Sequence, residues 1–74
     1  MKAFVLLVYS SGHAIGIEKK LKNLGVPCKL TSIPRNLSSD CGICVRFDET
    51  GLKTVEALVR TLPFDIQEIA EIDS

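Results

Sequence analysis

Residues 4–9, FVLLVY, constrain the fold more than any other stretch of the chain. Both alternating sets of positions are apolar, so a strand formed here needs cover on both of its faces. Such a strand belongs at the centre of a sheet or at an interface. The run is far too short to span a bilayer, and we expect no membrane partner.

A helix is predicted directly after this strand. Ser10 or Ser11 can cap it, because a hydroxyl oxygen accepts a hydrogen bond from an amide of the first turn. Gly25 and Pro27 then stop the helix. Apolar residues spaced three or four apart form one stripe along it, at Ala14, Ile17, Leu21 and Leu24.

The second half of the chain repeats this order. Residues 28–33 alternate weakly and predict an edge strand, whereas residues 43–48 predict a strand with one buried face. A second helix follows, capped by Asp48 or Thr50. Its apolar stripe is Leu52, Val55, Leu58, Val59 and Leu62. In the tail an isoleucine recurs at every third position, and we expect a last strand with a bulge.

The order strand–helix–strand, twice, predicts an α+β fold in one domain, residues 1–74. It matches the ferredoxin-like βαββαβ plan, a two-layer sandwich with a four-stranded antiparallel sheet and two helices on one face. The first and third strands would be central. The other face of the sheet would be open, and its apolar side chains suggest a homodimer through it.

Composition narrows the function classes. Nine basic and nine acidic side chains cancel, and no basic stripe is present, so we expect no nucleic-acid partner. Three cysteines, an odd number, do not make the disulfide framework of a secreted protein. With no signal-peptide cleavage site in view, we expect a cytoplasmic protein, where a CxxC motif is reactive or metal-binding rather than structural.

Such a motif, Cys41 to Cys44, follows a polar loop and opens the third predicted strand. A structural zinc site needs four ligands, and the two thiols with His13 supply three, so we expect no metal. Thioredoxin-type enzymes place CxxC at a helix start, which this segment is not. We expect no cofactor either.

The predicted topology brings this motif to a helix N-terminus. The first strand ends, and the third begins, at the same edge of the sheet. The residues expected to meet there are Ser10, Ser11, Gly12, His13 and Cys41. A helix N-terminus stabilises a thiolate and lowers its pKa. Arg35 would add positive charge, while Asp40 would oppose the effect.

Several short motifs together resemble a small family of unknown function described as putative Se/S carrier protein-like. They are Ser10 to His13, Gly25-Val26-Pro27, Pro34-Arg35, Ser38-Ser39 and Cys41-Gly42. The resemblance implies a carrier, rather than a turnover enzyme, whose cysteine holds sulfur or selenium as a persulfide or selenopersulfide. Cys41 is the position that carries over. The implied partners are a donor such as a cysteine desulfurase, and an acceptor protein.

The neighbouring residues admit two readings each. Gly42 removes side-chain bulk and lets a partner's backbone approach Cys41. His13 is either a base for that thiol or a polar residue of the first helical turn. Cys44 is either a resolving thiol or a partly buried strand residue, and i and i+3 of a strand point to opposite faces.

The hydroxyl-bearing residues are also open to two readings. Ser38 and Ser39, with Ser11 and Gly12, either contact an anion or substrate or form turns. Cys28 would be structural, at the far end of the sheet. The alternative function is a non-catalytic adaptor or ligand-sensing module with ordinary thiols, which fold alone does not exclude.

Overall fold

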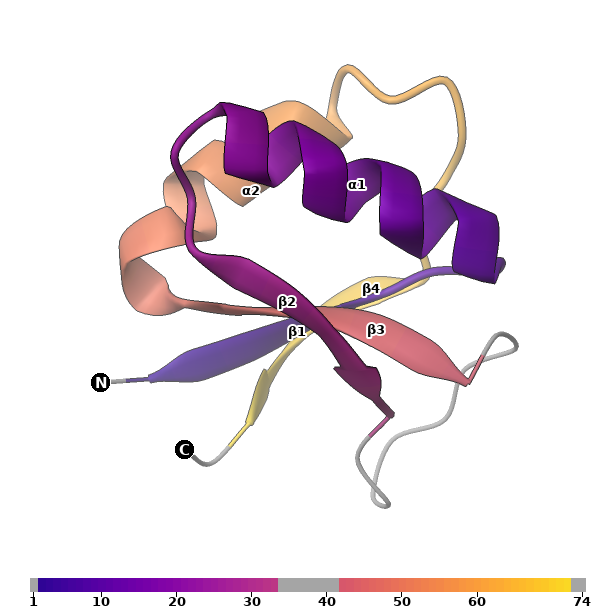
Figure 1. Ribbon diagram of the computed structural model, residues 1–74, viewed down its shortest axis with the longest axis horizontal. Helices are drawn as coiled ribbons and strands as arrows, with labels where there is room; N and C mark the ends of the chain where they lie inside the picture. The colour runs from indigo at the N-terminus through magenta and orange to yellow at the C-terminus, as the bar shows by residue number, and fades with distance from the viewer. Residues whose placement is uncertain (1, 34–41, 73–74) are drawn as a thin grey trace.

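The protein is described by a computed structural model that covers residues 2–33 and 42–72. A four-stranded antiparallel sheet carries two helices on one face (Figure 1). The elements are β1 (Ala3–Leu7), α1 (Ser11–Asn23), β2 (Cys28–Ser32), β3 (Ile43–Asp48), a 3-10 turn (Glu49–Gly51), α2 (Leu52–Val59) and β4 (Glu68–Ile72). The strand order is β2-β3-β1-β4, so the first and third strands are central, as predicted.

The central strand is shorter than its apolar run. β1 ends at Leu7, while Val8 is still fully buried and Tyr9 is 51% exposed. The chain has to leave the sheet here, because Ser10 already adopts the extended N-cap conformation of α1. Leu24 also departs from the prediction. It is the C-cap of α1 and is 58% exposed, so the buried stripe stops at Leu21.

The predicted bulge in the last strand is wrong. β4 pairs with β1 in unbroken register, from Ala3 opposite Ile72 to Leu7 opposite Glu68. The threefold isoleucine spacing arises because Ile66 precedes the strand. Within β4, Ile69 packs on the helix side of the sheet and Ile72 packs on the other side.

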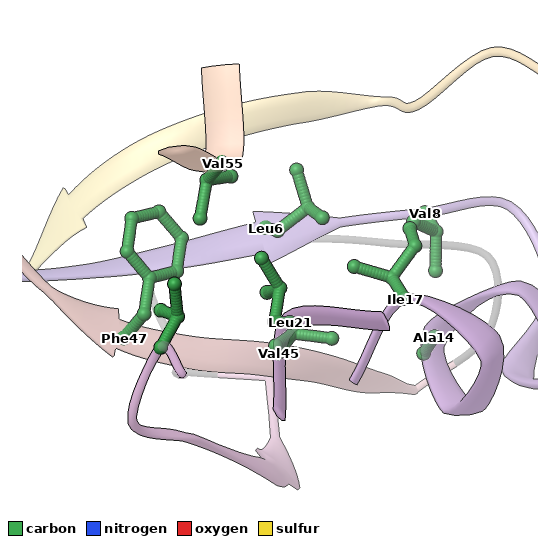
Figure 2. Packing of buried hydrophobic residues seen from close by; sticks show 9 residues of the cluster. Leu6, Val8, Ala14, Ile17, Leu21, Val45, Phe47 and Val55 are labelled. Atoms are coloured by element: carbon green, nitrogen blue, oxygen red, sulfur yellow. The ribbon is translucent and has the colours of Figure 1, made fainter. Parts of the chain in front are cut away.

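Two clusters of buried side chains account for the apolar character of β1. On the helix side one cluster includes side chains from β1, β3, α1 and α2 (Figure 2). Its members are Leu6, Val8, Ala14, Ile17, Leu21, Val26, Val45, Phe47 and Val55. On the other side Val5, Leu7 and Cys44 are also fully buried, with Ile33, Ala70 and Ile72 packed against them. Both faces of β1 are therefore covered within one chain.

This burial changes the expectation for the second sheet face. That face was expected to be open and to carry apolar side chains, but Val5 and Leu7, which lie on it, have no exposed surface. Dimerisation through that face stays a prediction. Val5 and Leu7 cannot supply its contact surface, because they are already buried. In the described part of the chain, neither helix is long and apolar enough to cross a membrane.

The helix-side cluster predicts a matched pair of leucine substitutions. Leu6→Ala removes a fully buried side chain and should lower the free energy of unfolding by about 2–5 kcal/mol. Leu24→Ala removes an exposed one and should change it by less than about 0.5 kcal/mol. Urea unfolding followed by circular dichroism measures both. Equal losses would contradict the described placement of these residues.

Candidate functional site

Three chain segments meet at one end of the sheet. β1 and β3 are paired so that Leu7 lies opposite Cys44, which brings the end of one strand to the start of the other. Gly42, just before β3, accepts a hydrogen bond from the Ile33 amide through its carbonyl, at 3.3 Å. The start of α1 lies at the same end of the molecule (Figure 1). Ser11, Gly12, His13 and Gly42 thus share this end.

Several residues singled out in the sequence lie outside the described ranges. They are Pro34, Arg35, Ser38, Ser39, Asp40 and Cys41. Their predicted contributions stay predictions. Gly42, the described residue nearest to them in the chain after the gap, is covalently joined to Cys41.

Ser10, rather than Ser11, caps α1. Its backbone is extended, and its Oγ accepts a hydrogen bond from the His13 amide at 3.2 Å. The first amides of a helix have no acceptor inside the helix, and they carry its positive dipole end. Ser11 and Gly12 are exposed, and this described first turn holds no acidic side chain to offset the dipole. The turn can therefore interact favourably with a negative charge.

His13 is held by an aromatic partner that the sequence did not suggest. Its ring stacks on Phe64, with centroids 3.7 Å apart and planes 7° from parallel. Phe64 lies in the connection between α2 and β4. No periodic pattern in the sequence links these two rings, because the contact depends on how the connection returns over the start of α1.

One nitrogen of this ring is left without a partner in the described part of the chain. Nδ1 of His13 is buried and has no hydrogen-bond partner among the described residues. An unpaired buried nitrogen is costly. The role of His13 as a base stays a prediction.

Gly42 is required for its backbone conformation. Its φ is +77°, in the left-handed region that side chains of L-residues rarely adopt. A Cβ at this position would meet no other atom within 4 Å. The expectation that this glycine leaves room for a partner's backbone stays a prediction. The constraint on Gly42 is the turn that leads into β3.

Cys44 occupies the interior. Its side chain is fully buried beside Val5 and Leu7, on the sheet face away from the helices. Its Sγ–H points at the Ser32 carbonyl oxygen, 3.8 Å away. This is the environment of a buried strand residue. A resolving thiol at this position would first have to become accessible, so that assignment stays a prediction.

Cys28 lies at the opposite end of the sheet, as expected of a structural thiol. It pairs with Phe47, and its Sγ donates a hydrogen bond to the Glu18 carbonyl oxygen at 3.6 Å. Burial raises the pKa of the Cys28 thiol, the Glu18 carboxylate raises it further, and Lys22 acts in the opposite direction. The neutral, less nucleophilic form is favoured.

The described residues form no cluster suited to a metal ion. Within residues 2–33 and 42–72, no three side chains of His, Cys, Asp or Glu come close enough to hold a metal ion. Cys41 stands outside this set, so the prediction about a zinc site is untested where that residue is concerned.

Comparison with known proteins places the chain in a family. A family model described as "Putative Se/S carrier protein-like" matches residues 3–71, nearly the whole chain. The chain belongs to this family. It is also 36% identical over 45 residues to the uncharacterized protein YtiA of Escherichia coli K12, a match that covers 61% of this chain and 53% of that protein. The matched part thus spans about half the length of this relative, and no solved structure matches.

Two glycines offer a test of the conformation at position 42. Gly42→Ala should cost about 1–2 kcal/mol of unfolding free energy, because it places a Cβ in the left-handed region. Gly16→Ala, inside α1 with open space around it, should instead stabilise by about 0.5–1 kcal/mol. Chemical denaturation of both variants reports the signs. Stabilisation by both would refute the left-handed backbone at Gly42.

The surroundings of Cys28 predict its reactivity. In a Cys41→Ser, Cys44→Ala background, the pH at which Cys28 reaches half its maximal alkylation rate should lie above that of a small free thiol, because its pKa is raised. Adding Glu18→Gln should move this pH downward, since one raising influence is removed. The iodoacetamide rate against pH measures both. A profile like that of free cysteine, unmoved by Glu18→Gln, would contradict the described environment.

Proposed function

We propose that this protein is a sulfur or selenium carrier that holds a persulfide or selenopersulfide on Cys41 and passes it between partner proteins. The observation that carries the proposal is the pairing of Leu7 with Cys44. Because of this register, the residue bonded to Cys41 lies at the same end of the sheet as the start of α1. The family description supports the same assignment.

The transfer proceeds in two exchanges. The Cys41 thiolate attacks the outer sulfur of a donor persulfide, a new S–S bond forms on Cys41, and the donor leaves as a thiolate. An acceptor thiolate then attacks the outer sulfur held on Cys41, and the Cys41 thiolate is regenerated. No net oxidation occurs, since each step breaks one S–S bond and makes another. A selenium atom in the outer position follows the same course.

The first turn of α1 suits this chemistry. A thiolate and a persulfide anion both carry negative charge, and the uncompensated amides of Ser11 and Gly12 would stabilise it. Arg35, Ser38 and Ser39 are proposed to add positive charge and hydroxyl contacts. His13 would take up or return the proton, with its ring held by the stack on Phe64.

The partners and the setting belong to the same proposal. A cysteine desulfurase would supply the persulfide in the cytoplasm, and a second protein would accept it. We assign the arrangement of strands and helices to the ferredoxin-like class.

Intact mass spectrometry tests the proposal directly. The protein is incubated with a cysteine desulfurase and cysteine, and in a second arm with a selenocysteine lyase and selenocysteine. Wild type and Cys28→Ser should each gain one sulfur or selenium atom, whereas Cys41→Ser should gain none. Cys28→Ser is the matched control, because it removes a thiol at the far end of the sheet.

The same measurement separates the alternative. A non-catalytic adaptor would show no added mass on Cys41, and its thiol would titrate like free cysteine. If the protein gains nothing while an established carrier loads under identical conditions, the carrier proposal is refuted.

A further inference from the structure

A hollow of about 480 Å³ lies at the end of the sheet away from Gly42. The starts of β1 and β2 and the end of β3 border it. Lys2, Lys29 and Arg46 line it, with Asp48 as the carboxylate among its lining residues. Its volume falls in the range of sites for small organic ligands. Two of the cations occupy an unfavourable arrangement unless something negative lies between them.

Lys29 and Arg46 face each other across two strands. The β2–β3 register pairs them directly, next to the pair of Cys28 and Phe47. Cys28 and Phe47 pack against the helix-side cluster, so strand alternation sends Lys29 and Arg46 to the other face. Directly opposed residues have Cβ atoms about 5 Å apart, and like charges in that position destabilise a sheet.

No described carboxylate forms an ion pair with Lys29 or Arg46, whereas Lys2 lies 4.0 Å from Glu71 at an exposed position. Asp48 lines the hollow and its negative charge offsets one of the three lining cations. Its Oδ1 also accepts hydrogen bonds from the amide and the hydroxyl of Thr50. The hollow thus has an excess of positive charge in a chain whose formal net charge is zero.

We propose that this hollow is a binding site for the phosphate group of a small organic molecule. Arg46 is half-buried and offers a planar fork to two oxygens, and Lys29 supplies a second positive charge beside it. A phosphate dianion matches two adjacent cations. The apolar lining at Ala3 and Pro27 would receive the body of the ligand.

The site is separate from the proposed carrier cysteine. Gly42 and Asp48 stand six residues apart along β3, which is about 20 Å of extended strand. Ligand binding at one end and sulfur loading at the other can therefore be measured independently. An Arg46→Gln variant should load sulfur on Cys41 like the wild type, so that failure of either proposal is distinguishable from failure of the other.

Nuclear magnetic resonance titration supplies the test. Inorganic phosphate and phenyl phosphate are added to ¹⁵N-labelled protein at constant ionic strength, with benzoate and potassium chloride as the comparison arms. Phenyl phosphate should give saturable shifts of the Ala3, Lys29 and Arg46 amides and should bind more tightly than phosphate, because the apolar lining adds contact. Shifts that do not saturate, that potassium chloride reproduces, or that benzoate matches in affinity would overturn the proposal.

Substitutions locate the binding energy. Arg46→Gln and Lys29→Gln should each weaken phenyl phosphate binding roughly tenfold, the loss expected for one charged hydrogen-bonding group. Lys19→Gln, which removes an exposed cation from α1, should leave the affinity unchanged. Lys29→Gln should also fold at least as stably as the wild type, because it relieves the repulsion. If all three variants weakened phenyl phosphate binding equally, the loss would come from the change in net charge and the proposed site would be overturned.

Discussion

The double burial of β1 is the constraint on which the structure depends. This strand is hydrogen-bonded to β3 on one edge and to β4 on the other, and apolar clusters cover both of its faces. A strand so enclosed has a fixed register, since a slip of one residue would exchange Val5 and Leu7 with Leu6 and Val8 between two differently shaped clusters. The fixed register in turn sets where β1 ends, and that point determines where α1 begins and where β3 enters.

The register of β1 also brings the start of α1 and the start of β3 to the same end of the sheet. The chain leaves β1 after Leu7, and Ser10 caps α1 three residues later. The β3 partner of Leu7 is Cys44, so Gly42 reaches the same end of the sheet. The proposed carrier site needs no cleft of its own, because a helix N-terminus and a glycine turn arrive together where two strands meet. The proposed phosphate site lies at the other end of the same sheet. There the register of the edge strand β2 places two cations opposite each other.

Much of this could be predicted from the sequence, because the apolar periodicities are strong. The bounds of β3 came from a local pattern, and the central places of β1 and β3 from the order of elements together with the apolar run of β1. The local pattern narrowed the helix cap to Ser10 or Ser11, and the structure shows that it is Ser10. Where prediction was wrong, longer-range geometry decided. The position of Leu24 depends on where the helix ends, and the regular register of β4 depends on its pairing with β1. The stack of His13 on Phe64 depends on the path of a connection that has no periodicity of its own. The opposition of Lys29 and Arg46 depends on the pairing register of β2 and β3, which the sequence pattern does not specify.

The place of β4 has a consequence for how the protein forms during synthesis. β1 is made before the other strands, yet one of its edges pairs with β4, which is made after all of them. Until β4 emerges, that edge presents unpaired amides and carbonyls beside one of the most apolar segments of the chain. Such an edge is a template for wrong pairing with another chain. Docking of β4 therefore closes an edge of β1 that would otherwise be open to wrong pairing.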